Sequence, residues 1–171
     1  MAKPKQSDSL EIAEDMDFQR ASWRVQRVGW VVMILLAFAA LAGLFGGGPL
    51  SNRVAGELSS GVAIEYERFI RLDAPQAIVF EIAPTGMESD SVARVWLDRA
   101  WIDSNQINEI SPQPVSSELY ADRIVYAFKV SRSPVPLRVR FNLENRAMGR
   151  VRGRAGLVNG APLSFEQFAY P

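Results

Sequence analysis

Arginines at alternate positions are the residues whose spacing most resembles a binding site. Arg138 and Arg140 are two residues apart, as are the members of a second set, Arg150, Arg152 and Arg154. Residues two apart lie on the same face of a β-strand, so each set predicts a row of guanidinium groups. A guanidinium group binds carboxylates and phosphates through paired hydrogen bonds, which is chemistry for recognising an anion.

Charge is segregated along the second half of the sequence. Residues 81–122 hold eight acidic residues against two arginines, a net charge of −6, whereas residues 132–154 hold seven arginines against one glutamate, a net charge of +6. The chain as a whole is neutral, with 19 basic and 19 acidic residues. If the two arginine-bearing stretches pair as a hairpin through residues 145–149, all five arginines lie on one face. A two-residue turn at Asn159-Gly160 then pairs Phe165 with Arg154 and adds Phe165 to that face. The alternative is a bulge that shifts the register.

Like charges opposite each other on neighbouring strands repel, so something negative is expected over this face. Water, counter-ions and the chain's own acidic segment are one set of candidates. An acidic partner protein and lipid headgroup phosphates are the functional candidates. The predicted partner-binding residues are Arg138, Arg140, Arg150, Arg152, Arg154 and Phe165.

Enzymatic chemistry finds little support in the residue types. The sequence has no His and no Cys, which removes the commonest general base, the thiol nucleophile and the usual zinc ligands. Asp103-Ser104-Asn105 begins like a calcium loop, but Asn108 stands where the glycine is needed and Pro114 where the last carboxylate belongs. Glu65 and Glu67 share one strand face, which is equally the pattern of a solvated surface. We therefore expect no catalytic residue, no metal, no cofactor and a protein that is not an enzyme.

An uncharged apolar run from Val28 to Phe45 dominates the first half of the chain. A run of about 18 to 20 apolar residues is long enough to cross a bilayer as a helix. Three arginines, at 20, 24 and 27, precede the run and only Arg53 closely follows it, so the positive-inside rule places the N-terminus in the cytoplasm. The alternative, a cleaved signal peptide, has small residues at Ala37 and Ala39 in its favour. Against it stand the run's length and the 27 residues before it.

Small residues recur at four-residue spacing late in the apolar run, at Ala39, Gly43 and Gly47. Such spacing lets two helices approach closely, so these three are the predicted helix-packing residues. The absence of Cys fits a bacterial periplasm better than a eukaryotic cell surface. The prediction is a single-pass protein of the bacterial inner membrane, with its C-terminal domain in the periplasm.

The domain organisation follows from these signals. We expect a cytoplasmic tail over residues 1–27, a transmembrane helix over 28–48, a connector over 49–60 and a periplasmic β-domain over 61–171. From residue 61 onward apolar and polar residues alternate in about seven short runs separated by turn residues, with no convincing helix. The fold class is therefore one transmembrane α-helix followed by an all-β antiparallel sandwich, for which immunoglobulin-like topology is the first expectation.

The function expected from these features is that of a non-enzymatic, membrane-anchored accessory or scaffolding subunit. It would dock beside another membrane protein through its span and its β-domain. The alternative is a periplasmic recognition module for an anionic cell-envelope ligand, either a glycan or a lipid headgroup. The membrane and a second membrane protein are the expected partners, in hetero- or homo-association, and nucleic acid is not.

Overall fold

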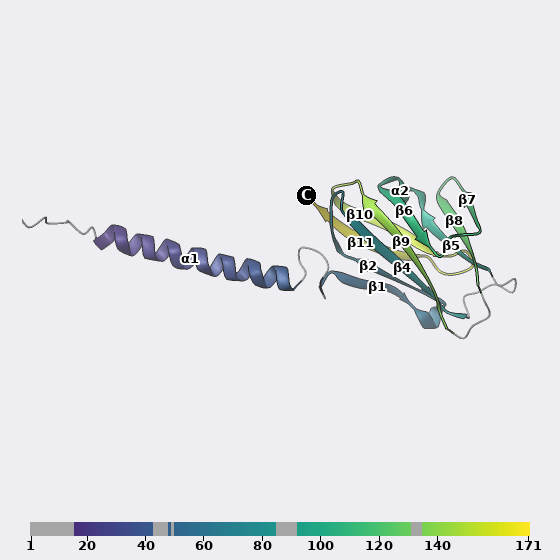
Figure 1. The fold of residues 1–171 in the computed structure, drawn as a ribbon, viewed down its shortest axis with the longest axis horizontal. Helices are drawn as coiled ribbons and strands as arrows, with labels where there is room; N and C mark the ends of the chain where they lie inside the picture. Colours follow the sequence, from purple (N-terminus) through teal and green to yellow (C-terminus); the bar gives the residue numbers. More distant parts are fainter. Residues whose placement is uncertain (1–15, 43–47, 49, 85–91, 131–134) are drawn as a thin grey trace, which may run out of the picture. The chain divides into compact units, whose positions relative to one another are not determined.

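The computed structural model describes residues 16–42, 48, 50–84, 92–130 and 135–171 (Figure 1). The chain divides into two units, residues 1–38 and 39–171, each of which is described by itself. Helix α1, Met16–Leu41, has an exposed apolar surface. Its segment Gln19–Leu41 passes the test of length and composition for crossing a membrane, a test that a signal sequence also passes. At 1.5 Å per residue this segment is about 35 Å long, against the roughly 30 Å of a bilayer core.

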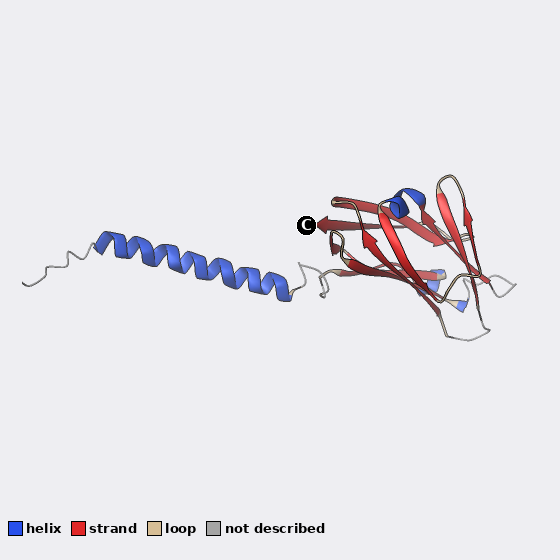
Figure 2. Cartoon of the chain, turned by 45° about the horizontal axis from the view of Figure 1, so that its top comes forward, coloured by secondary structure: helices blue, strands red, loops and turns tan. Residues whose placement is uncertain are grey.

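The second unit is an all-β domain of two sheets (Figure 2). The five-stranded sheet has the order β1-β2-β4-β9-β6 and is antiparallel throughout. Its strands are β1 (Asn52–Glu57), β2 (Val62–Glu67), β4 (Pro75–Ile82), β9 (Leu137–Asn145) and β6 (Asn105–Ser111). A one-turn 3₁₀ helix, η1 (Leu58–Ser60), links β1 to β2.

The six-stranded sheet has the order β3-β11-β10-β5-β8-β7. Its strands are β3 (Phe69–Arg71), β11 (Leu163–Tyr170), β10 (Gly149–Leu157), β5 (Val92–Asp98), β8 (Arg123–Lys129) and β7 (Ser116–Leu119). Only the pairing of β3 with β11 is parallel among its described strands. A short helix, α2 (Arg99–Asp103), follows β5 and was not expected from the sequence.

The hydrophobic core lies between the two sheets, which makes the domain a β-sandwich. Its largest buried side chains come from both, with Phe80 and Phe141 on one sheet and Phe128 on the other. The Phe141 ring meets the Phe80 ring at 5.4 Å and the Phe128 ring at 6.4 Å, both edge to face. The alternation of apolar and polar residues predicted these strands correctly, because one side of each sheet faces this core and the other faces solvent.

Two sequence-based boundaries differ from the structure. The segment 49–60, expected as a connector, contains β1, whose side chains are almost all exposed and so give no alternating apolar signal. Its backbone pairs with β2 from Asn52 opposite Glu67 to Glu57 opposite Val62. The alternating run that begins at Val62 is split at Arg68 into β2 and β3, which belong to different sheets.

Candidate functional site

Strand β10 carries three exposed arginines, Arg150, Arg152 and Arg154, which we call the arginine ladder. Alternate residues of β10, including Val151 and Ala155, are buried in the core, so the period of two turns all three arginines to the outer face of the six-stranded sheet. Their side chains are 61% to 70% exposed. The sequence therefore predicted this row correctly.

Two carboxylates flank the ladder. Glu166 on β11 receives the Nε of Arg150 at 3.1 Å and the Nε of Arg152 at 2.9 Å, one on each of its oxygens. Asp98, at the end of β5, receives the Nε of Arg154 at 3.1 Å and is only 17% exposed. Three guanidinium groups thus share two carboxylates, which leaves the ladder with a surplus of one positive charge. The chain's own acidic segment, through Asp98, supplies part of the counter-charge.

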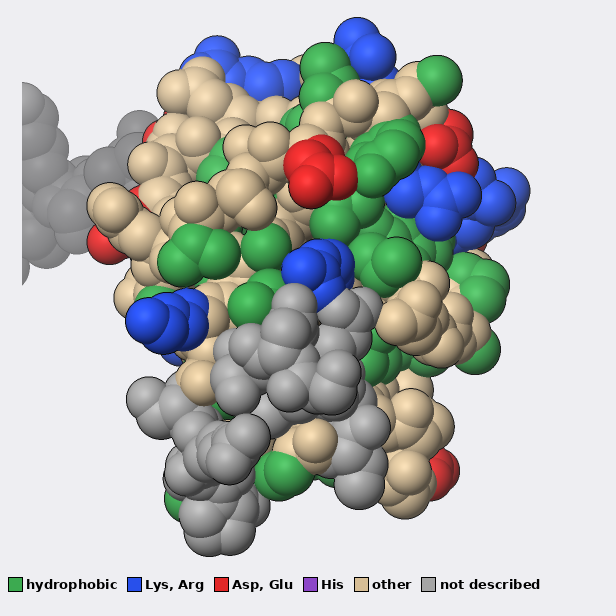
Figure 3. Space-filling model, turned by 90° about the vertical axis from the view of Figure 1, so that its right-hand side faces the viewer, with side chains coloured by type: hydrophobic (Ala, Val, Ile, Leu, Met, Phe, Trp, Pro, Cys, Tyr) green, Lys and Arg blue, Asp and Glu red, His purple; other side chains and the backbone are tan. Residues whose placement is uncertain are grey.

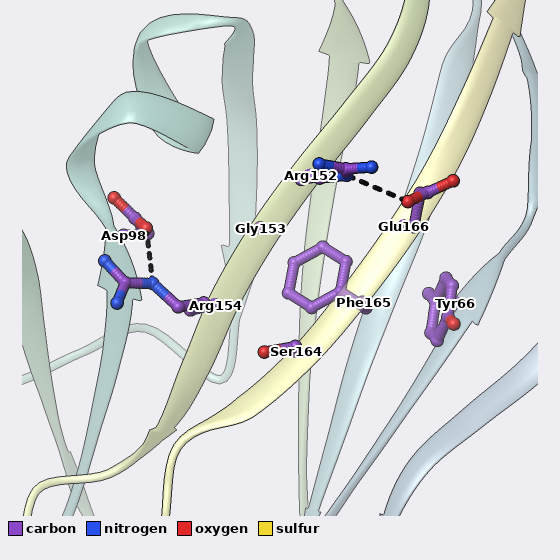
Figure 4. A pocket seen from close by; sticks show the side chains of 8 residues that line it. All are labelled: Tyr66, Asp98, Arg152, Gly153, Arg154, Ser164, Phe165 and Glu166. Carbon is purple, nitrogen blue, oxygen red and sulfur yellow. Dashed lines mark hydrogen bonds and ion pairs between the residues drawn. The ribbon is translucent and has the colours of Figure 1, made fainter.

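A pocket of about 560 Å³ lies among these ion pairs (Figure 4). Its lining residues are Tyr66, Asp98, Arg152, Gly153, Arg154, Ser164, Phe165 and Glu166. In Figure 4 the Arg154 side chain turns toward Asp98, while Arg152 turns the opposite way toward Glu166. Gly153 stands between the two arginines and has no side chain. The pocket is therefore flanked by two ion pairs, with an aromatic ring among its walls.

Phe165 was predicted to join the arginines on the surface, and this prediction was wrong. The pairing of strands β10 and β11 places Gly153 opposite Phe165 and Arg154 opposite Ser164, one residue away from the expected register. A shift of one residue moves a side chain to the other face of a sheet. Phe165 is consequently 3% exposed and packs in the core, with its ring centroid 5.4 Å from those of Trp101 and Tyr66.

Arg138 and Arg140 were predicted to share a surface with the ladder, and this too was wrong. They lie on β9 in the five-stranded sheet, whereas the ladder lies on β10 in the six-stranded sheet. The link from Asn145 to Gly149 crosses between the sheets and makes no hairpin. The buried Asn145 side chain holds this link by donating to the carbonyl oxygen of Ala147 and accepting from its amide.

The outer face of the five-stranded sheet is acidic rather than basic. Arg138 bridges Glu65, at 3.0 Å, and Glu81, at 2.9 Å. Arg140 lines a groove of about 350 Å³ together with Glu65 and Glu67. On the end of the domain that Figure 3 shows, apolar side chains lie among both acidic and basic groups, and no single sign of charge covers that end.

Two tryptophans take positions that the sequence only partly indicated. Trp101 on α2 is 1% exposed and belongs to the hydrophobic core. Trp96 shares a face of β5 with Arg94 and Asp98, the outer face of its sheet, and is 7% exposed. There its Nε1 donates to the Leu157 carbonyl oxygen at 3.1 Å, and the Arg123 guanidinium lies 4.9 Å above its ring. The Arg123 guanidinium thus covers the ring on the outer face.

The predicted helix-packing residues were Ala39, Gly43 and Gly47. Ala39 lies in α1 and is half-buried, and Gly43 and Gly47 fall outside the described residues. Within the described part of the chain, no group of three or more carboxylates could hold a metal ion. Sequence reasoning missed the flanking roles of Glu166 and Asp98, whose only signal was their position on strands next to β10.

Comparison with known proteins adds little. No protein-family model matches this sequence, and no curated protein sequence matches it. A solved structure similar to the chain is a cohesin module from a Clostridium perfringens ATCC13124 family 33 glycoside hydrolase. The two are 14% identical, the match covers 68% of this chain and 96% of that module, and the TM-score is 0.42.

Proposed function

We propose that this protein is a non-enzymatic accessory or scaffolding subunit of the bacterial inner membrane, which docks beside another membrane protein. In this proposal α1 is an uncleaved anchor with its N-terminus in the cytoplasm, and the sandwich, of immunoglobulin-like topology, lies in the periplasm. The apolar length of α1 and the arginines at its N-terminal end support the anchor and its orientation. The two face-packed, mostly antiparallel sheets support the topology.

The observation that carries the docking role is the arginine ladder with its incomplete neutralisation. Glu166 is shared between Arg150 and Arg152, so an acidic side chain of a partner can replace or supplement it. Phe168 stands on the same outer face, opposite Arg150, and is 49% exposed. Arginine and aromatic residues side by side are enriched at protein interfaces, where a carboxylate partner meets the guanidinium and apolar groups cover the ring.

A second candidate function is recognition of an anionic cell-envelope ligand, a glycan or a lipid headgroup. The pocket beside Arg152 and Arg154 favours it, because two guanidinium groups and a serine hydroxyl lie around one cavity. A protein partner would engage the whole ladder and Phe168, whereas a small ligand would need only the pocket. The two candidates therefore differ in their dependence on Arg150 and Phe168, neither of which lines the pocket.

The test is co-purification of the full chain in mild detergent after crosslinking in cells. The ladder variant replaces Arg150, Arg152 and Arg154 with Ser. The matched control replaces three other exposed arginines, Arg53, Arg71 and Arg99. Both variants should fold, because exposed ion pairs contribute only about 0–1 kcal/mol each.

A stoichiometric membrane-protein partner that is lost with the ladder variant and kept with the control supports docking. Loss of the partner with the single change Phe168→Ser distinguishes a protein interface from a small ligand in the pocket. Equal capture by ladder and control variants contradicts the proposal. Orientation is tested separately by fusing a reporter active only in the periplasm after Pro171, and activity from a cytoplasmic reporter alone would reverse the assignment.

A further inference from the structure

Three arginines on α1 lie on one stripe of the helix surface. Arg20, Arg24 and Arg27 are spaced four and three residues apart, so at 3.6 residues per turn they fall within an arc of about 60°. Trp23 lies beside them within an arc of about 100° and is 65% exposed. Together with Gln19, these four residues line a hollow of about 490 Å³ on the helix surface.

The contacts of two of these arginines supply no negative charge. The Nε of Arg24 donates to the Arg20 carbonyl oxygen at 3.4 Å, and the Arg27 guanidinium lies 5.8 Å from the Trp23 ring centroid. Asp17, three residues before Arg20, is the nearest acidic residue in the sequence, and none follows Arg20 until Glu57. Like charges at this helical spacing are unfavourable unless an anion lies between them. The stripe therefore has the chemistry of an anion site.

The residues that follow the stripe select the kind of anion. Directly after Arg27 the helix surface becomes apolar, and Trp30, Val31 and Ile34 continue along the same side with exposures of 50% to 57%. A phospholipid presents its phosphate immediately above its acyl chains. A guanidinium stripe one or two turns before an apolar stripe matches that order, whereas a soluble anion or an acidic peptide needs no apolar continuation. Indole rings such as that of Trp23 favour the same interfacial level.

We infer that Arg20, Arg24 and Arg27, with Trp23, form a binding site for the phosphate of an anionic phospholipid headgroup. The inference rests on the proposed anchoring of α1 in a membrane. It is independent of the arginine ladder, which belongs to the β-domain. Arginine suits the role because its planar fork can hold two phosphate oxygens at once.

The experiment moves the charges without changing their number, so that the topological signal is kept. The shuffled variant combines Arg20→Ser with Ser22→Arg, and Arg27→Gln with Gln26→Arg. It leaves Arg24 on one side of the helix and puts the other two arginines on the opposite side. The control is the β-domain variant with Arg53, Arg71 and Arg99 replaced by Ser. Each full chain is extracted from vesicles of equal parts phosphatidylglycerol and phosphatidylcholine, and native mass spectrometry counts the retained lipids.

The parent and the control should enrich phosphatidylglycerol over phosphatidylcholine. The enrichment by the shuffled variant should be about tenfold lower, since each basic residue near an anionic surface contributes appreciably to the binding energy. Equal enrichment by parent and shuffled variant overturns the site. Removal of the enrichment by millimolar inorganic phosphate shows a site for free phosphate and overturns the lipid assignment. Alkaline extraction of the membranes is a separate readout. A parent released by alkali contradicts the anchor itself, whereas a parent that stays without lipid preference contradicts only the headgroup site.

Discussion

Phe165 fills the space that a side chain at Gly153 would occupy. The two residues are opposite each other on the β10–β11 ladder, and a Cβ added at Gly153 would stand 2.5 Å from the Phe165 Cζ and 2.7 Å from the Trp101 Cδ1. Real Cβ atoms do not approach other atoms so closely, so both buried rings or the backbone would have to move. The missing side chain at Gly153 thus permits the edge-to-face contact of Trp101 with Phe165 at 5.4 Å.

Replacement of Gly153 by alanine should therefore destabilise the sandwich by about 1–3 kcal/mol, the usual cost of overpacking a core. Urea unfolding of the full chain in detergent, followed by tryptophan fluorescence, measures the change. A second variant, Gly153→Ala with Phe165→Leu, should recover part of the loss because the smaller side chain vacates the space. Unchanged stability in the single variant would contradict the packing argument.

Asp98 is expected to matter more for stability than an ordinary surface acid. Its carboxylate accepts from the Ala100 amide at 3.2 Å, which caps α2, and from the Arg154 Nε at 3.1 Å. Asp98→Ala should cost about 1–2 kcal/mol, since loss of an N-cap alone costs about 1 kcal/mol. Asp98→Asn should cost less, because an amide oxygen still caps the helix. The control is Asp103→Ala, an exposed residue whose carboxylate oxygen lies 3.8 Å from the Arg99 Nε, and a loss equal to that of Asp98→Ala would refute the special role.

A chain of buried amides links the two sheets. The Gln76 Nε2 donates to the Asn105 Oδ1 at 3.3 Å, and the Gln76 Oε1 accepts from the Gln167 Nε2 at 2.8 Å. Gln76→Leu leaves the buried Asn105 Oδ1 without this donor, whereas the Gln167 Nε2 keeps its hydrogen bond to the Glu67 carbonyl oxygen at 2.9 Å, so it should cost about 1–3 kcal/mol. Gln167→Leu should cost less, because its Oε1 is already buried without a hydrogen-bond partner among the described residues. Denaturant midpoints of the two single variants and of the double variant measure these losses of stability. The double variant should lose less stability than the sum of the two single losses.

Stability should be nearly flat across neutral pH, because the sequence has no His and no Cys. Hydrogen bonding from Arg123 lowers the pKa of Asp122 below its ordinary 3.8. A lowered pKa stabilises the fold above the ordinary value and loses that contribution as pH falls through the folded value, in strongly acidic solution.

At the alkaline end, burial raises the pKa of Tyr126 above 10.0. A raised pKa stabilises the fold below pH 10 and loses that contribution as pH rises through the folded value. Thermal melts from pH 3 to 11 test both ends. Ultraviolet absorbance should show two tyrosines that ionise later than usual, because the hydrogen bond to Glu118 also raises the pKa of Tyr120. A stability change centred near pH 6 or 7 would contradict the expectation.

The alternation of residue types predicted where the strands run, but it did not predict which strands are neighbours in a sheet. In β9 the residues Val139 and Phe141 are buried while Arg138 and Arg140 are exposed, as a period of two requires. The same period cannot say which sheet a strand joins. The β9–β10 hairpin failed for that reason, since the decisive feature is the side chain of Asn145 holding a crossing link.

The register between β10 and β11 and the edge strand β1 could not be predicted from the sequence, for related physical reasons. The expected two-residue turn at Asn159-Gly160 put Phe165 opposite Arg154, and the difference of one residue exchanged a surface aromatic for a core aromatic. Strand β1 has no apolar alternation because its pairing relies on the backbone, so composition alone marked it as a connector. The arginine ladder was found and its counter-charges were not, because Glu166 and Asp98 approach it only through strand pairing.

The parallel pairing of β3 with β11 has a consequence for how the domain is made. Phe69 is paired with Phe168, 99 residues later, and those two strands lie side by side at one edge of the sheet. A chain that emerges N-terminus first presents β3 long before its neighbour exists. Contacts of such long sequence separation slow folding, because the entropy of closing the loop is lost before the contact forms. Until β11 has been synthesised, β3 therefore lacks the strand with which it pairs in the folded domain.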